Sequence, residues 1–309
     1  MTNTSFTTSY ETFCMNMQEE VKKRSKEGSK VRLQTVRKLN GVILQGITIT
    51  DEHRSIMPTI YLDKFFTMYK KGQSMEEVAT LFMEEYEEAE VEAGFDIQFF
   101  SDYEKVKPHL YFRLLHCELN KELLEQVPYQ KYLDLAIVCY CDIRGGCIPH
   151  GSILIKKDHL VMWKVSEEQL IKDSMKNMES LYPADLMNMA VLLKELYIDP
   201  VSLLSLNFPM YVLTNKERLN GAASLLYEGQ LEKLAKILGE DYYVLPSSIH
   251  EVIIVPKSKV VDEEELSHMV NEINQEHLQR EEVLSNHAYY YDGLKEELVC
   301  LPLIPKQKD

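Results

Sequence analysis

Apolar residues recur at helical spacing near the start of the chain and then give way to strand-like runs around a turn. Phe13, Met17 and Val21 are four residues apart, so they share one face of a helix that we predict from about residue 7 to residue 26. The runs VRLQTVRKL and VILQGITIT then flank Asn40-Gly41. Asn and Gly tolerate the positive φ angles of a type I′ turn, so this segment predicts a β-hairpin.

Two more helices are expected before the chain reaches Gly94. One spans about residues 62–71, and the other starts at Ser74, which forms a capping box with Glu77. The apolar positions that we expect to line one face of the second helix are Val78, Leu81, Phe82 and Tyr86.

Strand-like runs dominate the middle of the chain. HLYFRLLHC, from His109, and YLDLAIVCYCDI, from Tyr132, each predict a buried strand, with a short helix over residues 120–126 between them. Residues 151–164 predict a second hairpin that turns at Lys157-Asp158.

A capped helix follows this second hairpin. Ser166 has a suitable side chain for the cap, and the helix is expected to end near Ser180, shortly before Pro183. Residues 184–206 have helical apolar spacing but are interrupted by Pro200, so they support no single assignment.

The remaining chain alternates between strands and helices. The pattern predicts, in order, strands in MYVLT (210–214) and GAASLLY (221–227), a helix over 229–238, paired strands in YYVLP (242–246) and EVIIVP (251–256), and a helix over 262–278.

The predicted elements define an α+β fold with mixed or antiparallel sheets, hairpins and amphipathic helices packed on them. We expect an N-terminal helix-hairpin-helix region over residues 1–105 and an α+β body over residues 106–309. In that body, SEEQL from Ser166 and DEEEL from Asp262 each follow an apolar hairpin. This recurrence suggests two ββα-like units, although helix-capping chemistry alone also produces such a similarity.

Composition narrows the range of functions. The chain has 309 residues and a net charge of −15, so a general affinity for nucleic acid or anionic membranes is not expected. Residues 76–92 contain eight Glu and no Lys or Arg, and residues 262–282 contain eight acids and one Arg. We interpret both runs as the solvated faces of helices that could contact a protein partner.

The start of the chain and its apolar content favour a cytoplasmic location. The segment MTNTSFTTSY lacks the basic start and apolar stretch of a secretory signal. No apolar run approaches the roughly 20 residues of a membrane helix.

The candidate catalytic residues lie between the last pair of predicted strands. Ser247, Ser248, His250 and Glu251 form a polar island in YYVLPSSIHEVIIVP. A hydroxyl, an imidazole and a carboxylate are the groups that nucleophilic catalysis requires. The structural alternative is that the serines close the turn by bonding its backbone, while His250 and Glu251 fix the strand register.

Two other groups of residues are candidates for ligand binding. Asn215 and Gly221 lie at predicted strand ends that could border the same edge of the sheet as the polar island. The second group has the spacing C-x-C-x5-C-x2-H, which could hold tetrahedral zinc, although buried strands also accept Cys as a small apolar residue. Its members are Cys139, Cys141, Cys147 and His150.

A basic cluster lies near the N-terminus and could dock an acidic partner or the acidic helices of the protein itself. It consists of Lys22, Lys23, Arg24, Lys26, Lys30, Arg32, Arg37 and Lys38. No phosphate-binding glycine loop, H-E-x-x-H or G-x-S-x-G is present. The common nucleotide hydrolases, zinc proteases and α/β-hydrolases are therefore excluded.

Three segments resemble one protein family. They are YVLTN from Tyr211, GAASLLY from Gly221 and LPSSIHEVIIVP from Leu245, and the middle segment with the helix carrying Asn177 is also similar. The chain resembles bacterial proteins of domain-of-unknown-function family 5688 over nearly its whole length. The resemblance implies a soluble bacterial protein and assigns no catalytic residue.

We therefore expect a non-catalytic binding or interaction protein without a cofactor. Asn215, Gly221 and Asn177 are its candidate binding residues. The alternative is a small-molecule or peptide hydrolase that uses Ser247 or Ser248 with His250 and Glu251.

Overall fold

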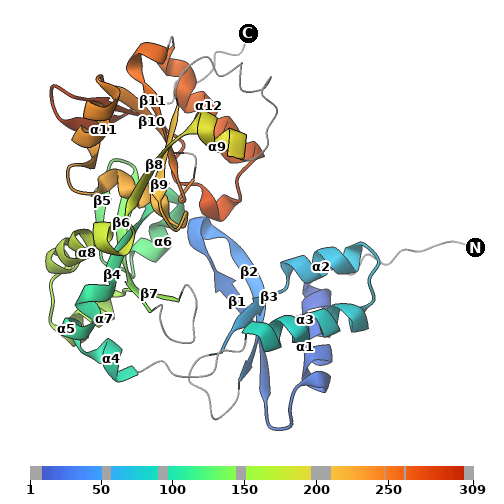
Figure 1. Ribbon diagram of the computed structural model, residues 1–309. Helices are drawn as coiled ribbons and strands as arrows, with labels where there is room; N and C mark the ends of the chain where they lie inside the picture. Colours follow the sequence, from blue (N-terminus) through green and yellow to red (C-terminus); the bar gives the residue numbers. More distant parts are fainter. Residues whose placement is uncertain are drawn as a thin grey trace, which may run out of the picture. The chain divides into compact units, whose positions relative to one another are not determined.

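The computed structural model describes residues 9–50, 57–89, 97–143, 151–195, 210–246, 248–260 and 262–302. The described chain forms two compact units (Figure 1). Unit 1 is built from residues before position 90, and unit 2 from residues after position 96. Both contain antiparallel sheets and helices, so the predicted α+β class is confirmed. The division at residues 105 and 106 stays a prediction.

Unit 1 contains a three-stranded antiparallel sheet in the order β1-β2-β3, and helices α1 and α3 pack against each other. Its described elements are α1 (Tyr10–Arg24), β1 (Lys30–Arg37), the short 3-10 helix η1 (Leu39–Gly41), β2 (Ile43–Thr50), β3 (Thr59–Tyr61), α2 (Asp63–Lys70) and α3 (Met75–Ala89).

The hairpin predicted at Asn40-Gly41 is confirmed. Both residues have positive φ, 56° at Asn40 and 69° at Gly41. The Val42 N–H donates to the Leu39 carbonyl across the turn at 3.2 Å. The turn thereby places Arg37 opposite Ile43 and fixes the register of β1 and β2.

The capping box predicted at the start of α3 is also confirmed. The Glu77 N–H donates to Ser74 Oγ at 3.2 Å, and the Ser74 N–H donates to Glu77 Oε2 at 2.8 Å. The predicted core position Leu81 is wrong, because its side chain is 37% exposed. At 3.6 residues per turn, Leu81 lies about 60° outside the buried face that begins at Val78.

Unit 2 contains two antiparallel sheets and the remaining described helices. Its elements are α4 (Ile97–Ser101), α5 (Tyr103–Val106), η2 (Lys107–His109), β4 (Leu110–His116), η3 (Glu118–Asn120), α6 (Lys121–Leu124), β5 (Tyr129–Tyr132), β6 (Leu135–Asp142), β7 (Ser152–Leu154), α7 (Lys157–Trp163), α8 (Glu167–Leu181), β8 (Ala184–Asn188), α9 (Met189–Glu195), β9 (Tyr211–Asn215), η4 (Gly221–Leu226), α11 (Gln230–Leu238), β10 (Tyr242–Leu245), β11 (Val252–Pro256), η5 (Lys257–Lys259), α12 (Glu263–Glu276), η6 (Arg280–Glu282), β12 (Tyr289–Asp292) and β13 (Glu297–Cys300).

The first sheet of unit 2 has β6 between β4 on one side and β5 with β7 on the other. The prediction of one strand from Tyr132 is wrong at its start, because the chain turns at Leu133 and Tyr132 pairs with Leu135. Leu133 has φ 54° and carries none of the usual signals of a turn. Helix α8 packs on β4, where the Phe112 N–H contacts Met178 Sδ at 3.3 Å.

The hairpin predicted to turn at Lys157-Asp158 is wrong, because α7 occupies this segment. Leu160 and Trp163, three residues apart, are buried, whereas Val161 is 77% exposed. That spacing belongs to a helix. The first of the two suggested ββα-like units therefore lacks its hairpin, whereas the predicted helix that follows, capped by Ser166, is confirmed as α8.

The second sheet has the order β13-β12-β10-β11-β9-β8. The predicted pairing of β10 with β11 is confirmed, with Tyr242 opposite Pro256. The strand predicted in GAASLLY is wrong, because Gly221–Leu226 forms η4, in which Ser224 Oγ donates to the Gly221 carbonyl at 2.7 Å. All residues from Gly221 to Leu225 are buried, so the segment has no exposed face. Its sequence therefore shows neither the alternation of polar and apolar residues of a strand nor the spacing of a helix.

One carboxylate joins distant parts of unit 2. Asp134 lies in the turn between β5 and β6, and its Oδ2 accepts a bond from Ser285 Oγ at 2.6 Å. Its Oδ1 accepts a bond from the Tyr289 hydroxyl at 2.8 Å. These contacts connect the first sheet to the segment that leads into β12. Within the described residues, no helix combines the length and apolar content needed to cross a membrane.

Candidate functional site

The predicted polar island lies in the link between β10 and β11, where three other segments of unit 2 meet it. The Ala222 N–H of η4 donates to the Ile249 carbonyl at 3.3 Å, and the Ile249 N–H donates to the Glu282 carbonyl at 2.9 Å. Thr214 Oγ1, near the end of β9, donates to the His250 carbonyl at 2.7 Å. We call this region, formed by residues 214–222, 248–251 and 282, the polar corner.

Ser248 acts within the polar corner as a turn residue. Its side chain is almost fully buried, with 2% of the residue exposed. Ser248 Oγ accepts the His250 N–H at 2.9 Å, and the Ser248 N–H donates to the Glu251 carbonyl at 3.2 Å. These two bonds are those of a serine that closes a turn by bonding its backbone.

His250 is oriented by partners other than Ser248. Its Nδ1 accepts the backbone N–H of Asn220 at 3.2 Å, so the neutral ring carries its proton on Nε2. Nε2 lies 3.7 Å from Glu282 Oε1, and the His250 side chain is 25% exposed. Both ring nitrogens therefore face groups outside a serine–histidine pair.

The hydrolase alternative gains no support from this geometry. The hydroxyl of Ser248 faces a backbone N–H, and the imidazole of His250 is directed at Asn220 and Glu282. Ser247 lies outside the described residues. Use of the island in catalysis stays a prediction.

Asn215 and Gly221 lie in the polar corner, as their sequence positions suggested. Asn215 is 1% exposed; its amide donates to the Leu219 carbonyl at 2.9 Å and its Oδ1 accepts the Leu219 N–H at 3.3 Å. A Cβ built on Gly221 would lie 2.6 Å from Asn215 N and 2.7 Å from the His250 carbonyl oxygen. The Asn215 side chain thus bonds the backbone at Leu219, and Gly221 allows β9 and the link to approach closely.

Asn177 contacts a different part of unit 2. Its amide donates to the Lys107 carbonyl at 2.7 Å and to the Leu110 carbonyl at 2.9 Å. The side chain therefore holds the start of β4 against α8. A role for Asn177 in ligand binding stays a prediction, as it does for Asn215 and Gly221.

Two of the four candidate zinc ligands are buried on β6. Cys139 and Cys141 are both 0% exposed, and burial raises the pKa of each thiol to about 12. Zinc binds thiolates, so a zinc ion at this place would have to displace the proton of each thiol. Cys147 and His150 lie outside the described residues, and the part of the chain that is described contains no cluster of three or more suitable ligands.

A buried polar cluster around Asp134 escaped the sequence predictions. His116 is 6% exposed, and its Nδ1 has no hydrogen-bond partner among the described residues. Burial lowers the pKa of His116, which is partly opposed by the nearby Asp134 carboxylate. Ser285 and Tyr289 are 151 and 155 residues from Asp134 in sequence, so no local pattern could have brought the cluster together.

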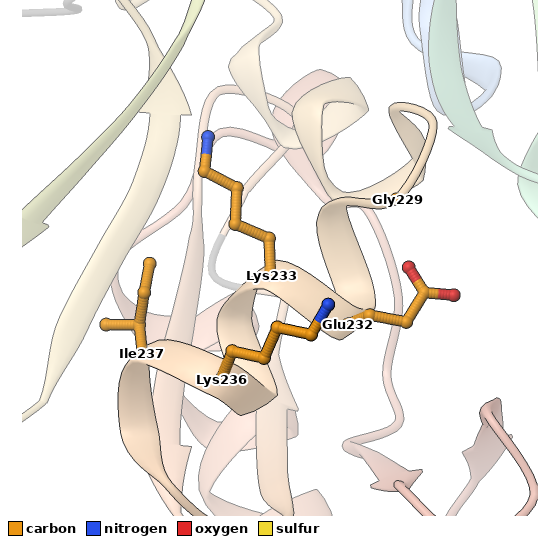
Figure 2. A pocket seen from close by; sticks show the side chains of 5 residues that line it. All are labelled: Gly229, Glu232, Lys233, Lys236 and Ile237. Carbon is orange, nitrogen blue, oxygen red and sulfur yellow. The ribbon is translucent and has the colours of Figure 1, made fainter.

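A shallow hollow of about 460 Å³ lies on α11 (Figure 2). It is lined by Gly229, Glu232, Lys233, Lys236 and Ile237. All five residues belong to one helix and its N-cap, so a single element lines the hollow in the part of the chain that the structure describes. In Figure 2 the side chains of Lys233 and Glu232 point away from the helix in different directions, whereas Lys236 extends across the front of it. This surface suits contact with another macromolecule better than enclosure of a small ligand.

A more enclosed cavity of about 320 Å³ lies in unit 1, which we call the α1–α3 cavity. The end of α1, the loop between α1 and β1, the end of β2 and the second half of α3 contribute to it. It is lined by Arg24, Ser25, Lys26, Ser29, Ile49, Met83, Tyr86 and Glu87. Four different elements or loops surround it, as is typical of a ligand site.

Part of the predicted basic cluster borders this cavity. Lys22 pairs with Glu19 and Lys23 with Glu20, both at 2.6 Å, and Arg24 also pairs with Glu20. Lys26 has no ion-pair partner among the described residues. The cluster is thus largely neutralised on α1, and Lys26 remains available at the cavity.

The fold and these sites define an α+β protein of two compact units with surface cavities and internally bonded polar clusters. The chain belongs to the family of unknown function DUF5688, which matches residues 10–293. This match confirms the resemblance predicted from the sequence. No curated protein and no solved structure matched the chain.

Proposed function

We propose that this protein is a non-catalytic binding protein and that the α1–α3 cavity takes a small amphipathic anion. The observation that carries the proposal is the division of the cavity into an apolar floor and a cationic rim. At about 320 Å³, the cavity has a size usual for small-molecule sites. A protein partner that contacts the acidic helices stays a prediction beside it.

The floor is rigid and apolar. Ile49 is 5% exposed and Tyr86 is 7% exposed, and the Tyr86 hydroxyl donates to the Ile49 carbonyl at 3.0 Å. This bond fixes the position of the tyrosine ring, and both residues line the cavity. Met83 extends the same surface and adapts readily to different ligand shapes. An apolar ligand body of one or two rings would bury its surface here.

The rim supplies charge and hydroxyl groups. Lys26 is exposed and Arg24 is half-buried, and Ser25 and Ser29 lie between the helix and β1. Among the described residues, Glu87 supplies a carboxylate to the rim. The site should therefore prefer an anionic head group near Lys26, and Glu87 should weaken its binding.

Fluorescence titration of the full chain with 8-anilinonaphthalene-1-sulfonate tests the proposal. This probe combines two aromatic groups with an anionic head. We expect saturable binding that Lys26→Glu weakens by about two- to fivefold and that Glu87→Gln strengthens by a similar factor, as for single exposed charges. The neutral probe Nile red should respond to neither change.

Lys22→Glu is the matched control, because Lys22 is an exposed lysine of α1 that does not line the cavity. It should leave the affinity for the anionic probe unchanged. Equal affinities in the Lys26, Glu87 and Lys22 variants would show that the probe binds elsewhere. Retention of binding by Met83→Trp, which should fill the cavity, would also contradict the proposal.

A further inference from the structure

Unit 2 has an arginine on the sheet face that α8 does not cover. Cys139 of β6 contacts Ser174 of α8 and is paired with Phe112, so both face α8. The neighbours of Phe112 on β4, Tyr111 and Arg113, therefore point to the opposite face. Tyr140 of β6 is paired with Tyr111, and Ser152 of β7 lies one strand further on. These four side chains belong to three strands of one sheet.

The guanidinium of Arg113 is held in place by neutral groups. Nε donates to the Tyr111 hydroxyl at 3.1 Å, and Nη2 donates to the same hydroxyl and to Ser152 Oγ, the latter at 2.9 Å. Its central carbon lies 4.1 Å from the centre of the Tyr140 ring. The side chain is half-buried, so packing and hydrogen bonds define its orientation before any ligand is present.

Within the described residues, no carboxylate lies within ion-pair distance of the Arg113 guanidinium. Asp142 shares the sheet face, but it accepts a bond from the Tyr182 hydroxyl at 3.1 Å and does not pair with Arg113. By contrast, Lys107 of the same unit lies 3.5 Å from Asp173. A half-buried guanidinium without a carboxylate partner is costly unless an anion compensates it.

We propose that Arg113 binds an oxyanion group, a carboxylate or a phosphate, of a small ligand. Nη1 has no bond to a described residue and carries two N–H groups, whereas both N–H groups of Nη2 already donate, one to Tyr111 and one to Ser152. Nη1 can therefore donate to one or two oxygens of an anion. The Tyr111 and Ser152 hydroxyls hold the guanidinium in place, and the Tyr140 ring supports its face. This site lies in unit 2 and is independent of the α1–α3 cavity.

Isothermal titration calorimetry of the full chain tests the proposal. One titration uses inorganic phosphate and a second uses acetate, with sodium chloride at the same ionic strength as the reference. We expect saturable binding in at least one arm, and the stronger arm identifies a phosphate or a carboxylate. Arg113→Lys should weaken that binding by roughly tenfold or more, because lysine keeps the charge but cannot bond Tyr111 and Ser152 and donate to the anion from one planar group. Ser152→Ala should weaken it by about two- to fivefold.

Arg218→Lys is the matched control, because Arg218 is an exposed arginine of unit 2 outside this cluster. It should not change the affinity. Failure of both anions to bind more tightly than chloride would refute the proposal, as would wild-type affinity in Arg113→Lys. If Arg113→Lys does not fold, wild-type affinity in folded Ser152→Ala refutes it equally.

Discussion

Gly221 has too little space around it for any side chain. A Cβ at this position would lie 2.6 Å from Asn215 N and 2.7 Å from the His250 carbonyl oxygen, and closer still to Thr214 Oγ1. The first two atoms belong to the backbone of paired strands or of the bonded link, so they cannot rotate away. Substitution of Gly221 by Ala must therefore separate β9 from the link.

The expected loss follows from two effects. Overpacking of a tight site costs about 1–3 kcal/mol. Separation also weakens the bond from Thr214 Oγ1 to the His250 carbonyl, which measures 2.7 Å and contributes about 1 kcal/mol. We expect Gly221→Ala to lower the free energy of unfolding by about 3 kcal/mol. With a urea dependence of about 2 kcal/mol per molar, the midpoint should fall by roughly 1.5 M.

The assay uses the single tryptophan of the chain, Trp163, which is buried in α7 and so reports on unit 2. Urea unfolding is followed by its fluorescence in wild type, Gly221→Ala and the control Gly239→Ala. Gly239 has φ 75° and open space around it, so its replacement carries only the backbone strain of about 1 kcal/mol. A loss at Gly221 no larger than the loss at Gly239 would refute the steric argument.

Three further predictions concern buried groups of unit 2. Burial lowers the pKa of His116, so the stability due to its neutral form is complete above the ordinary imidazole pKa and is lost as the pH falls through the lowered pKa. The urea midpoint of His116→Phe should therefore fall less between pH 7 and pH 5 than the midpoint of the wild type. An equal fall in both proteins would contradict this. Because their thiols have pKa values of about 12, Cys139 and Cys141 should react with a disulfide reagent at pH 8 only in denaturant, and rapid labelling of either in native protein would be inconsistent with their burial. Ser285→Ala should cost about 1–3 kcal/mol in the same urea assay, because the bond to Asp134 involves a charged acceptor, and a loss below about 0.5 kcal/mol would show that the bond adds little.

Elements whose ends carry local chemical signals could be predicted from the sequence. Ser74 and Glu77 satisfy each other's backbone groups, and Asn40 and Gly41 accept positive φ, so α3 and the first hairpin follow from neighbouring residues alone. The helix α11 was predictable because it combines regular apolar spacing with glycines at both of its caps.

Segments whose conformation depends on distant contacts could not be predicted. At Gly221, β9 and the link leave no room for a side chain. Nothing in the local sequence shows that the segment from Gly221 forms η4 and not a strand. Leu133 takes up a left-handed conformation that its side chain does not favour, so the turn before β6 gave no signal. For α7, the spacing of Leu160 and Trp163 was the available clue, and the hairpin prediction overlooked it.

The candidate site was predictable in composition but not in geometry. The sequence suggested that Ser248 and His250 lie at one end of a sheet and that Asn215 could border it, and in the structure these residues and Gly221 lie in the polar corner. Their bonding depends on Asn220 and Glu282, which come from other segments and determine where the imidazole points. Arg113 was missed because its partners lie on three strands, two of them distant in sequence.

The two bonds of Asp134 have a consequence for synthesis on the ribosome. Its partners Ser285 and Tyr289 emerge from the ribosome 151 and 155 residues later than Asp134 itself. Until then, the carboxylate at the β5–β6 turn must remain solvated, and the nascent first sheet cannot be closed at that end. Unit 2 should thus reach its native state only after nearly complete translation, so a stalled or truncated chain is expected to present this turn to proteases and chaperones.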